Sequence, residues 1–251
     1  MDGNIYIKRL GTVDSTNRYA RDKAATLWSK AGSDSIIAVT AEHQTAGRGQ
    51  RGNSWQSQPG CNLLLTLLVK PGEALEATRQ FLLSQTVAVA LHSAMKEYGI
   101  DTSLKWPNDI YVGKKKLAGI LIELDYSGHF IEQATIGIGL NVNQTGFPPM
   151  ERTPVSMHTL TGIEFDVEEV LCRVLGKFKE YYTMLTGGNG AQIASEYGKL
   201  LLGAGSEQRF IDADGEFCAI ICGVEPCGKL MLRTADGETR RYAFKEVEMI
   251  L

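Results

Sequence analysis

The apolar pattern of the chain changes near residue 204, and this change constrains the fold more than any other feature. Up to that point, stretches with the apolar spacing of a helix alternate with short β-branched runs, which is typical of an α+β domain. After Glu207, about five short strands are expected because turn signals recur at close intervals. These turns are Asp214-Gly215, Pro226-Cys227-Gly228 and Asp236-Gly237. We therefore predict a large α+β domain over residues 1–204 and a small β-barrel-like domain over residues 205–251.

The first domain is expected to combine helices with a sheet. Asp166 followed by Glu169 is a pattern of helix N-termini, and Gly99 is suited to the position after a helix. The expected helices cover residues 18–28 and 80–98, and a third begins after Asp166. The expected strands cover residues 35–41, 62–69, 104–112, 117–124 and 129–141.

Composition excludes several classes of function. The 251 residues carry a net charge of −3, so the chain has no overall attraction to nucleic acid or to an acidic membrane surface. The five cysteines form no CxxC pair, which disfavours a disulfide scaffold or a zinc site. No apolar stretch approaches the roughly 20 residues of a membrane span, and the N-terminus lacks the apolar run of a signal peptide. A cytoplasmic protein is expected.

The segment GRGQRGNSW at residues 47–55 is the most informative functional motif. Its glycines let backbone amides approach a ligand closely. Arg48 and Arg51 can pair with phosphate or carboxylate oxygens, and Trp55 supplies a flat apolar face. The loop is therefore suited to hold an anion beside a ring system.

A P-loop is an alternative interpretation of this segment. Gly47, Gly52 and Ser54 have the spacing of G-x-x-x-x-G-K-[ST], but Asn53 occupies the place of the lysine that reaches the phosphates. Without that charge the P-loop hypothesis loses its main chemical device.

Two clusters add charged groups suited to the same chemistry. In KWPND the proline restricts the backbone, so that Lys105, Asn108 and Asp109 stand on a stiff bend. Asp109 is a candidate to hold Mg²⁺ together with phosphate. In KKKLAGI, Lys116 directly precedes an apolar strand and can stabilise charge that builds on a phosphate.

The segment GIGLNVN, which starts at Gly137, offers close backbone approach followed by amides, and Asn141 is a candidate adenine reader. The segment lacks the third glycine of the dinucleotide fingerprint. The histidines have no metal-ligand spacing, and there is no G-x-S-x-G nucleophile motif. Because no covalent nucleophile is evident, the sequence indicates chemistry by positioning and electrostatics.

Taken together, five motifs in this order resemble those of the biotin protein ligases. They are DSTN at residues 14–17, Gln44 with the loop at residues 47–55, KWPND, KLAGI and GIGLNVN. The resemblance implies a catalytic domain similar to class II aminoacyl-tRNA synthetases, with a mixed sheet and flanking helices, followed by an SH3-like domain. It also implies a two-step reaction. Biotin and ATP give biotinyl-5′-AMP and pyrophosphate, and a lysine of a biotin carboxyl carrier domain then takes the biotinyl group and releases AMP.

The resemblance also implies roles for individual residues. The catalytic set comprises Lys116, Arg48 and Lys105. The biotin-binding set comprises Ser15, Thr16, Asn17, Gln44, Gly47, Arg48, Gln50, Lys116 and Gly119. The nucleotide-binding set comprises Arg51, Trp55, Asn108 and Asn141, with Asp109 as a ligand of the Mg²⁺ that accompanies ATP.

The chain departs from the family pattern in two places. Gln50 stands where many members have arginine, which leaves the retention of the adenylate an open question. The DSTN motif lies so near the N-terminus that we expect no winged-helix DNA-binding domain, and hence no DNA partner and no repressor function. A homodimer stays open, because edge strands in such a domain can pair or remain free.

Two alternatives from the same residues stay in view. A lipoate–protein ligase shares the fold and the two-step chemistry, but the loop at residues 47–55 and KWPND favour biotin. A non-catalytic sensor would use the pocket only for binding, and the presence of Lys116 and Asp109 argues against it.

Overall fold

The computed structural model describes residues 4–148 and 152–251, and the side chain of Arg51 also lies outside the described part. The strands of the first domain are β1 (Ile5–Val13), β2 (Ile36–Gln44), β3 (Leu63–Val69), β4 (Gly72–Glu76), β5 (Ser103–Lys105), β6 (Asp109–Val112), β7 (Lys115–Ser127) and β8 (Phe130–Leu140). The helices are α1 (Thr16–Asp22), α2 (Ala24–Ala31), α3 (Phe81–Glu97), α4 (Met157–Thr161), α5 (Val167–Thr186) and α6 (Gly190–Leu200). Two 3₁₀ turns are η1 (Gln50–Gly52) and η2 (Ala77–Arg79).

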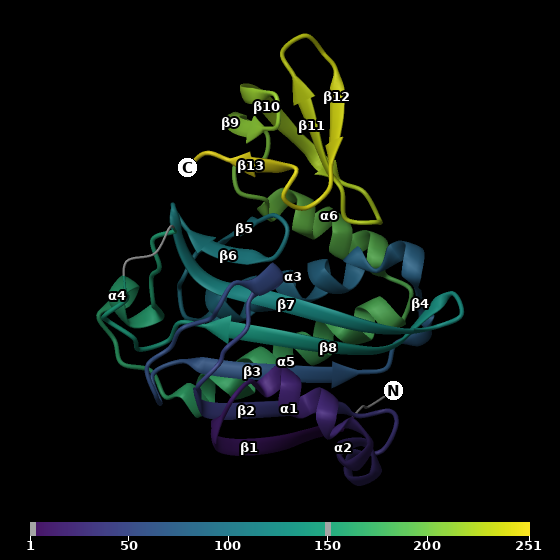
Figure 1. Ribbon diagram of the computed structural model, residues 1–251, viewed down its shortest axis with the longest axis vertical. Coiled ribbons are helices and arrows are strands. Elements are labelled where there is room, and N and C mark those ends of the chain that lie inside the picture. Colours follow the sequence, from purple (N-terminus) through teal and green to yellow (C-terminus); the bar gives the residue numbers. More distant parts are fainter. Residues whose placement is uncertain (1–3, 149–151) are drawn as a thin grey trace.

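The strands of the first domain form one mixed sheet. It has eight strands, in the order β1-β2-β3-β8-β7-β6-β5, with β4 paired to β8 at the side. β1 pairs parallel with β2, whereas β2, β3, β8, β7, β6 and β5 pair antiparallel with their neighbours. Helices α3 and α5 lie behind this sheet in Figure 1, and α1 and α2 lie at its other face. The predicted α+β class is confirmed.

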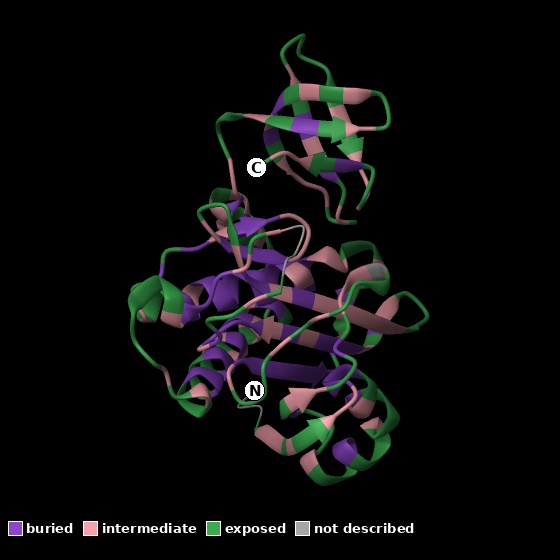
Figure 2. Ribbon diagram, turned by 60° about the vertical axis from the view of Figure 1, so that its left-hand side comes forward, coloured by how far each residue is buried: buried purple, intermediate pink, exposed green. Residues whose placement is uncertain are grey.

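Alternate residues of a central strand pack against different helices. In β2, Ile36 and Ala38 belong to the large core that includes α3 and α5, whereas Ile37 and Val39 pack against α1 and α2. β3 is buried along its whole length, since helices cover both of its faces (Figure 2). The rigid centre of the sheet therefore lies directly beneath the loops that follow β2 and β8.

The helix predictions need one correction. The helix predicted over residues 80–98 is α3 (Phe81–Glu97), and Gly99 follows its C-cap at a φ of 71°, as expected. Asp166 caps α5, where its carboxylate accepts from the Glu168 amide. The single helix predicted over residues 18–28 is wrong, because the chain breaks at Lys23 into α1 and α2. The break lets α1 pack over β3 and β8 while α2 packs on β2.

The strand predicted over residues 104–112 is also wrong, since it is a hairpin. β5 and β6 pair antiparallel around a turn at residues 106–108, with a cis Trp106-Pro107 bond. The register places Lys105 opposite Asp109. The stiff bend predicted for KWPND is therefore the turn of a hairpin, with a cation and a carboxylate in paired positions on its two strands.

The C-terminal strands form the five-stranded sheet predicted from the turn signals. They are β9 (Glu207–Asp212), β10 (Gly215–Val224), β11 (Leu230–Thr234), β12 (Thr239–Tyr242) and β13 (Val247–Met249). Their order is β12-β11-β10-β9-β13, with antiparallel pairing throughout. We refer to residues 207–251 as the C-terminal module, which stands above the large sheet in Figure 1. The domain boundary predicted at residues 204 and 205 falls between α6 and β9 and stays a prediction.

Candidate active site

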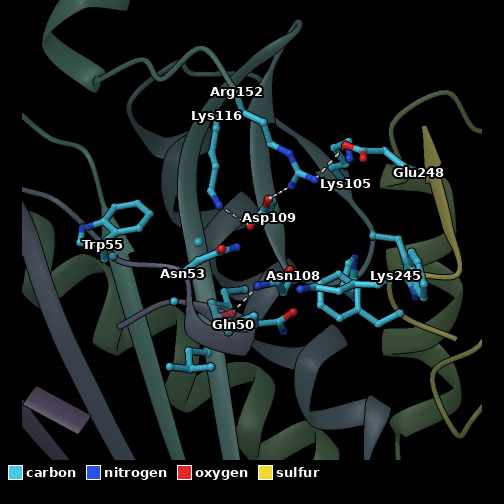
Figure 3. A pocket seen from close by; sticks show the side chains of 18 of the residues that line it. Gln50, Asn53, Trp55, Lys105, Asn108, Asp109, Lys116, Arg152, Lys245 and Glu248 are labelled. Carbon is cyan, nitrogen blue, oxygen red and sulfur yellow. Dashed lines mark hydrogen bonds and ion pairs between the residues drawn. The ribbon is translucent and has the colours of Figure 1, made fainter. Parts of the chain in front are cut away.

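A cavity of about 760 Å³ lies between the large sheet and the C-terminal module (Figure 3). One wall comes from the start of α1, the loop after β2 and the strands β7 and β8. The other wall comes from the β5–β6 turn and from β9 and residues 244–249 of the C-terminal module. The cavity thus joins segments that lie far apart in the sequence.

One end of the cavity is neutral and rich in hydrogen bonds. The Thr16 amide and hydroxyl both donate to Gln44 Oε1, at 2.7 and 3.0 Å. The hydroxyl of the fully buried Thr66 on β3 lies 2.8 Å from Thr16 Oγ1 and 2.6 Å from Asn17 Oδ1. Ser15 is also buried here, at the N-terminus of α1. These polar groups are held by one another and by the core of the sheet.

Three glycines make a flat floor next to this end. Gly119 on β7 pairs with Gly139 on β8, and Gly137 lies two residues away on the same face. A Cβ at Gly137 would overlap Asn17, and a Cβ at Gly139 would overlap the ring of Trp55. The glycines of the GIG motif are therefore required by close approach of side chains rather than by backbone conformation.

The loop at residues 47–55 folds back on itself over the floor. The Gly49 amide donates to Asn53 O at 2.7 Å, and the Trp55 amide donates to Gly47 O at 2.9 Å. Within the described residues, Trp55 Nε1 and Gln50 Oε1 are buried without a hydrogen-bond partner. Buried polar atoms are rarely left unpaired, so this loop has unused hydrogen-bonding capacity for a ligand.

The other end of the cavity is cationic, and carboxylates hold its cations. Lys116 Nζ lies 2.7 Å from Asp109 Oδ1 and 5.8 Å from the centre of the Trp55 ring. Asp109 is only 5% exposed, and its second oxygen lies 3.2 Å from Arg152. Lys116 and Arg152 are therefore neutralised within the protein. Arg48 lies apart from them, because its partner Glu123, 3.3 Å away, also accepts from Asn17 Nδ2 at 3.2 Å beside the neutral end.

Lys105 is the buried cation of this end. Burial and, to a smaller extent, the nearby Arg152 guanidinium lower the pKa of its ammonium from 10.5 to about 8. Asp109 acts in the opposite direction by favouring the charged form. An anion bound here would raise the pKa of Lys105 and keep it charged above pH 8.

The structure brings most of the predicted site residues to the cavity. Those that line it are Ser15, Thr16, Asn17, Gln44, Arg48, Gln50, Trp55, Lys105, Asn108, Asp109, Lys116 and Gly119. Gly47 borders them from behind, beside Gln44 and Trp55. Asn141 is buried outside the lining, and its amide donates to Val155 O at 3.0 Å. The side chain of Arg51 lies outside the described residues.

Several residues that shape the cavity were missed from the sequence. Thr66 stands in an apolar run, and Arg152, Phe244, Lys245 and Glu248 belong to no motif. They reach the site only through the packing of the C-terminal module and of the chain after β8. Arg152 links the large domain to the C-terminal module, because it pairs with Asp109 on β6 at 3.2 Å and with Glu248 on β13 at 3.0 Å.

Comparison with known families assigns this arrangement to a class. The model of the biotin/lipoate A/B protein ligase family matches residues 11–141, just over half of the chain. A biotin–[acetyl-CoA-carboxylase] ligase from Paracoccus denitrificans is 33% identical over 91% of this chain and 94% of its own length. The chain therefore belongs to the biotin/lipoate A/B protein ligase family.

Other similar proteins include a bifunctional ligase/repressor and a biotin protein ligase of known structure. The bifunctional ligase/repressor BirA of Bacillus spizizenii is 32% identical over 82% of this chain, and the match spans 64% of that relative. The biotin protein ligase from Aquifex aeolicus in complex with biotin and ATP has 26% identity and a TM-score of 0.80, covering 98% of each chain. This likeness confirms the predicted catalytic fold with its C-terminal β domain. No helix in the described parts of the chain is long and apolar enough to cross a membrane.

Proposed function

We propose that this protein activates biotin as biotinyl-5′-AMP and transfers the biotinyl group to a lysine of a biotin carboxyl carrier domain. The observation that carries the proposal is a single cavity with a neutral hydrogen-bonding end and a cationic end. Biotin has a neutral ureido ring and a carboxylate, so its two ends match the two ends of the cavity. The relatives named for biotin, and the Aquifex complex with biotin and ATP, support the same substrates.

In the first step, a biotin carboxylate oxygen attacks the α-phosphorus of ATP. The bond from that phosphorus to the bridging oxygen breaks, and pyrophosphate leaves with the electron pair. Lys116 and Lys105 offset the repulsion between the two anions and stabilise charge as it builds on the phosphate. Ser15, Thr16 and Gln44 hold the ureido ring through their hydroxyl and amide groups.

In the second step, the neutral amine of the acceptor lysine attacks the carbonyl carbon of the mixed anhydride. An amide bond forms, the amine loses a proton, and AMP leaves. Arg48, Gln50 and the rest of the glycine loop cover the anhydride and exclude water, which would otherwise hydrolyse it. Trp55 lies on the glycine floor beside Lys116, at the junction between the acid and the phosphate.

On the nucleotide side, Asn108 lines the cavity, although its amide nitrogen already donates to Ile120 O at 2.6 Å. We assign Asn108 to the adenine side, with Arg51 as a second candidate. Asn141 lies outside the cavity, just after β8, where its side-chain amide donates to Val155 O.

The surroundings of Asp109 favour a positioning role over the predicted role of a magnesium ligand. Lys116 Nζ and Arg152 lie 2.7 and 3.2 Å from its two oxygens, so a metal ion would have to displace one of these cations. Asp109 fits better as the group that positions Lys116. Magnesium would then enter with ATP as part of the nucleotide substrate.

Product analysis tests the proposal. The protein is incubated with ATP and either labelled biotin or labelled lipoate, and a carrier domain is then added. We expect biotinyl-5′-AMP first and labelled carrier second, with no label on a carrier whose acceptor lysine is replaced by arginine. An adenylate formed with lipoate but not with biotin overturns the assignment. ATP hydrolysis without either acid would instead support the P-loop alternative.

A further inference from the structure

Lys245 has an unusual backbone conformation for a lysine. Its φ is 75°, and it is the only residue other than glycine in the left-handed region among the described parts of the chain. This conformation costs a residue with a Cβ free energy, and such outliers persist only where the surroundings hold them. The position therefore calls for an explanation.

The turn around Lys245 is held firmly by its neighbours. The Ala243 amide donates to the Glu246 carboxylate at 2.6 Å, and the Glu246 amide donates to Ala243 O at 3.1 Å. Phe244 packs edge-on against Trp106 of the β5–β6 turn, with ring centres 6.1 Å apart. Val247 is buried in the C-terminal core. These contacts fix the turn against the catalytic domain and leave Lys245 at its tip.

The tip of this turn lines the cavity. The side chain of Lys245 is exposed to the cavity, and no carboxylate lies within ion-pair distance of it among the described residues. Arg48, Lys116 and Arg152 all have such a partner. An ammonium without a partner has its full charge available for an anionic ligand, whereas the paired cations must first exchange a carboxylate.

The place of Lys245 identifies which anion it meets. Figure 3 shows Trp55 at one side of the cavity, Asp109 and Asn108 in the middle, and Lys245 at the opposite side. The neutral end formed by Thr16 and Gln44 belongs to the side of Trp55. The acid attacks the α-phosphate of ATP, so the adenosine and the β- and γ-phosphates both extend away from the acid. Of these two parts only the phosphates are anionic, and an ammonium without a carboxylate partner favours them.

We propose that Lys245 of the C-terminal module binds the β- and γ-phosphates of ATP and stabilises pyrophosphate as it leaves. The proposal rests on the proposed function, because it assumes that ATP is the second substrate. Lys245 keeps its proton throughout, and its ammonium donates hydrogen bonds to the phosphate oxygens as they take up negative charge. The module therefore supplies a binding residue to the first half-reaction.

Biotin-dependent exchange of labelled pyrophosphate into ATP tests this role, with KM measured separately for each substrate. Lys245→Gly removes the charge and suits the left-handed backbone, so the melting temperature should equal or exceed that of the unaltered protein. We expect KM for ATP and for pyrophosphate to rise about fivefold, while KM for biotin stays unchanged. Lys245→Arg should keep both values close to the original.

Lys229→Ala is the matched control, since it removes one exposed lysine from the same module outside the cavity. It should leave all three KM values unchanged. Unchanged KM values for ATP and pyrophosphate in Lys245→Gly overturn the proposal. So does an increase confined to KM for the carrier domain, which would assign Lys245 to acceptor binding. If the unaltered protein itself shows no biotin-dependent exchange, the proposed function fails before the variant is compared.

Discussion

The neutral and cationic ends of the cavity are built in different ways. At the neutral end, Thr16, Asn17 and Gln44 are tied to one another and to Thr66 in the buried centre of the sheet. At the cationic end, Lys116 and Arg152 are tied to Asp109, and the C-terminal module contributes through Glu248. The first end is preorganised for a neutral group. The second is neutralised until an anion replaces its carboxylates, so binding there involves an exchange of partners.

The cationic end should give the largest effect when its central lysine is removed. Lys116→Ala is expected to lower the rate of adenylate formation about 100- to 1,000-fold, because it removes a preorganised charge beside the reacting phosphate. Single-turnover formation of the adenylate measures this rate. Lys115→Ala, which alters an exposed neighbour on the same strand, should leave the rate unchanged. A normal rate in Lys116→Ala would remove this residue from its role.

The floor between the two ends should be the next most sensitive feature. Gly139→Ala places a methyl group where the Trp55 ring lies, so we expect kcat/KM for adenylate formation to fall about 100-fold as the ring and loop shift. Gly176→Ala is the control, since it lies within α5 with open space around it and should stabilise the fold by about 0.5–1 kcal/mol. Full activity in Gly139→Ala would show that the ring has no fixed place.

A substitution at the neutral end should change KM for one substrate only. Thr66→Val removes the buried hydroxyl between Thr16 and Asn17 and should destabilise the fold by about 1–2 kcal/mol. KM for biotin should rise about tenfold, whereas KM for ATP should not change. Thr66→Ser keeps the hydroxyl and should retain the KM for biotin. Equal increases in both KM values would contradict the division into two ends.

The smallest effect concerns pH at the cationic end. Because the pKa of Lys105 is lowered to about 8, the residue loses its charge in the free protein above that pH. KM for ATP should therefore rise about fivefold between pH 7 and pH 9. Lys105→Gln, which is neutral throughout, should give a high KM that does not change over this range.

The same lysine affects stability with a definite sign. Between pH 8 and 10.5 the unfolded chain keeps the proton of Lys105 while the folded protein releases it. The contribution of this residue to the free energy of unfolding therefore increases with pH across that window. Denaturant titrations of the protein and of Lys105→Gln should differ in this slope. A slope that is the same in both would show that burial does not lower the pKa.

The sequence predicted the parts of the molecule that depend on local patterns. Helix α3 and the five C-terminal strands follow from apolar spacing and turn signals, and Lys116 follows from its place before an apolar strand. Thr16 and Gln44 were assigned to the site through the family resemblance. The break at Lys23 could not be predicted, because it depends on how two helices pack on a twisted sheet.

The side-chain contacts of the site residues could not be predicted from the sequence for a similar reason. Nothing near Asp109 in the chain indicates that Arg152 would pair with it, or that Glu248 would in turn pair with Arg152, since these contacts depend on tertiary packing. The amide of Asn141 bonds behind the pocket because β8 ends there and residue 155 runs alongside. Motifs therefore identified the residues of the site, and packing decided which groups each of them contacts.

Exchange of labelled pyrophosphate into ATP, measured with biotin, with lipoate and with no acid, tests the central claim most directly. The two-ended cavity predicts exchange that requires biotin, because its hydrogen-bonding end matches a ureido ring and not the apolar dithiolane of lipoate. Without a bound acid no adenylate forms, and pyrophosphate then has nothing to attack to regenerate ATP. Exchange with lipoate alone, or with no acid present, would contradict the account.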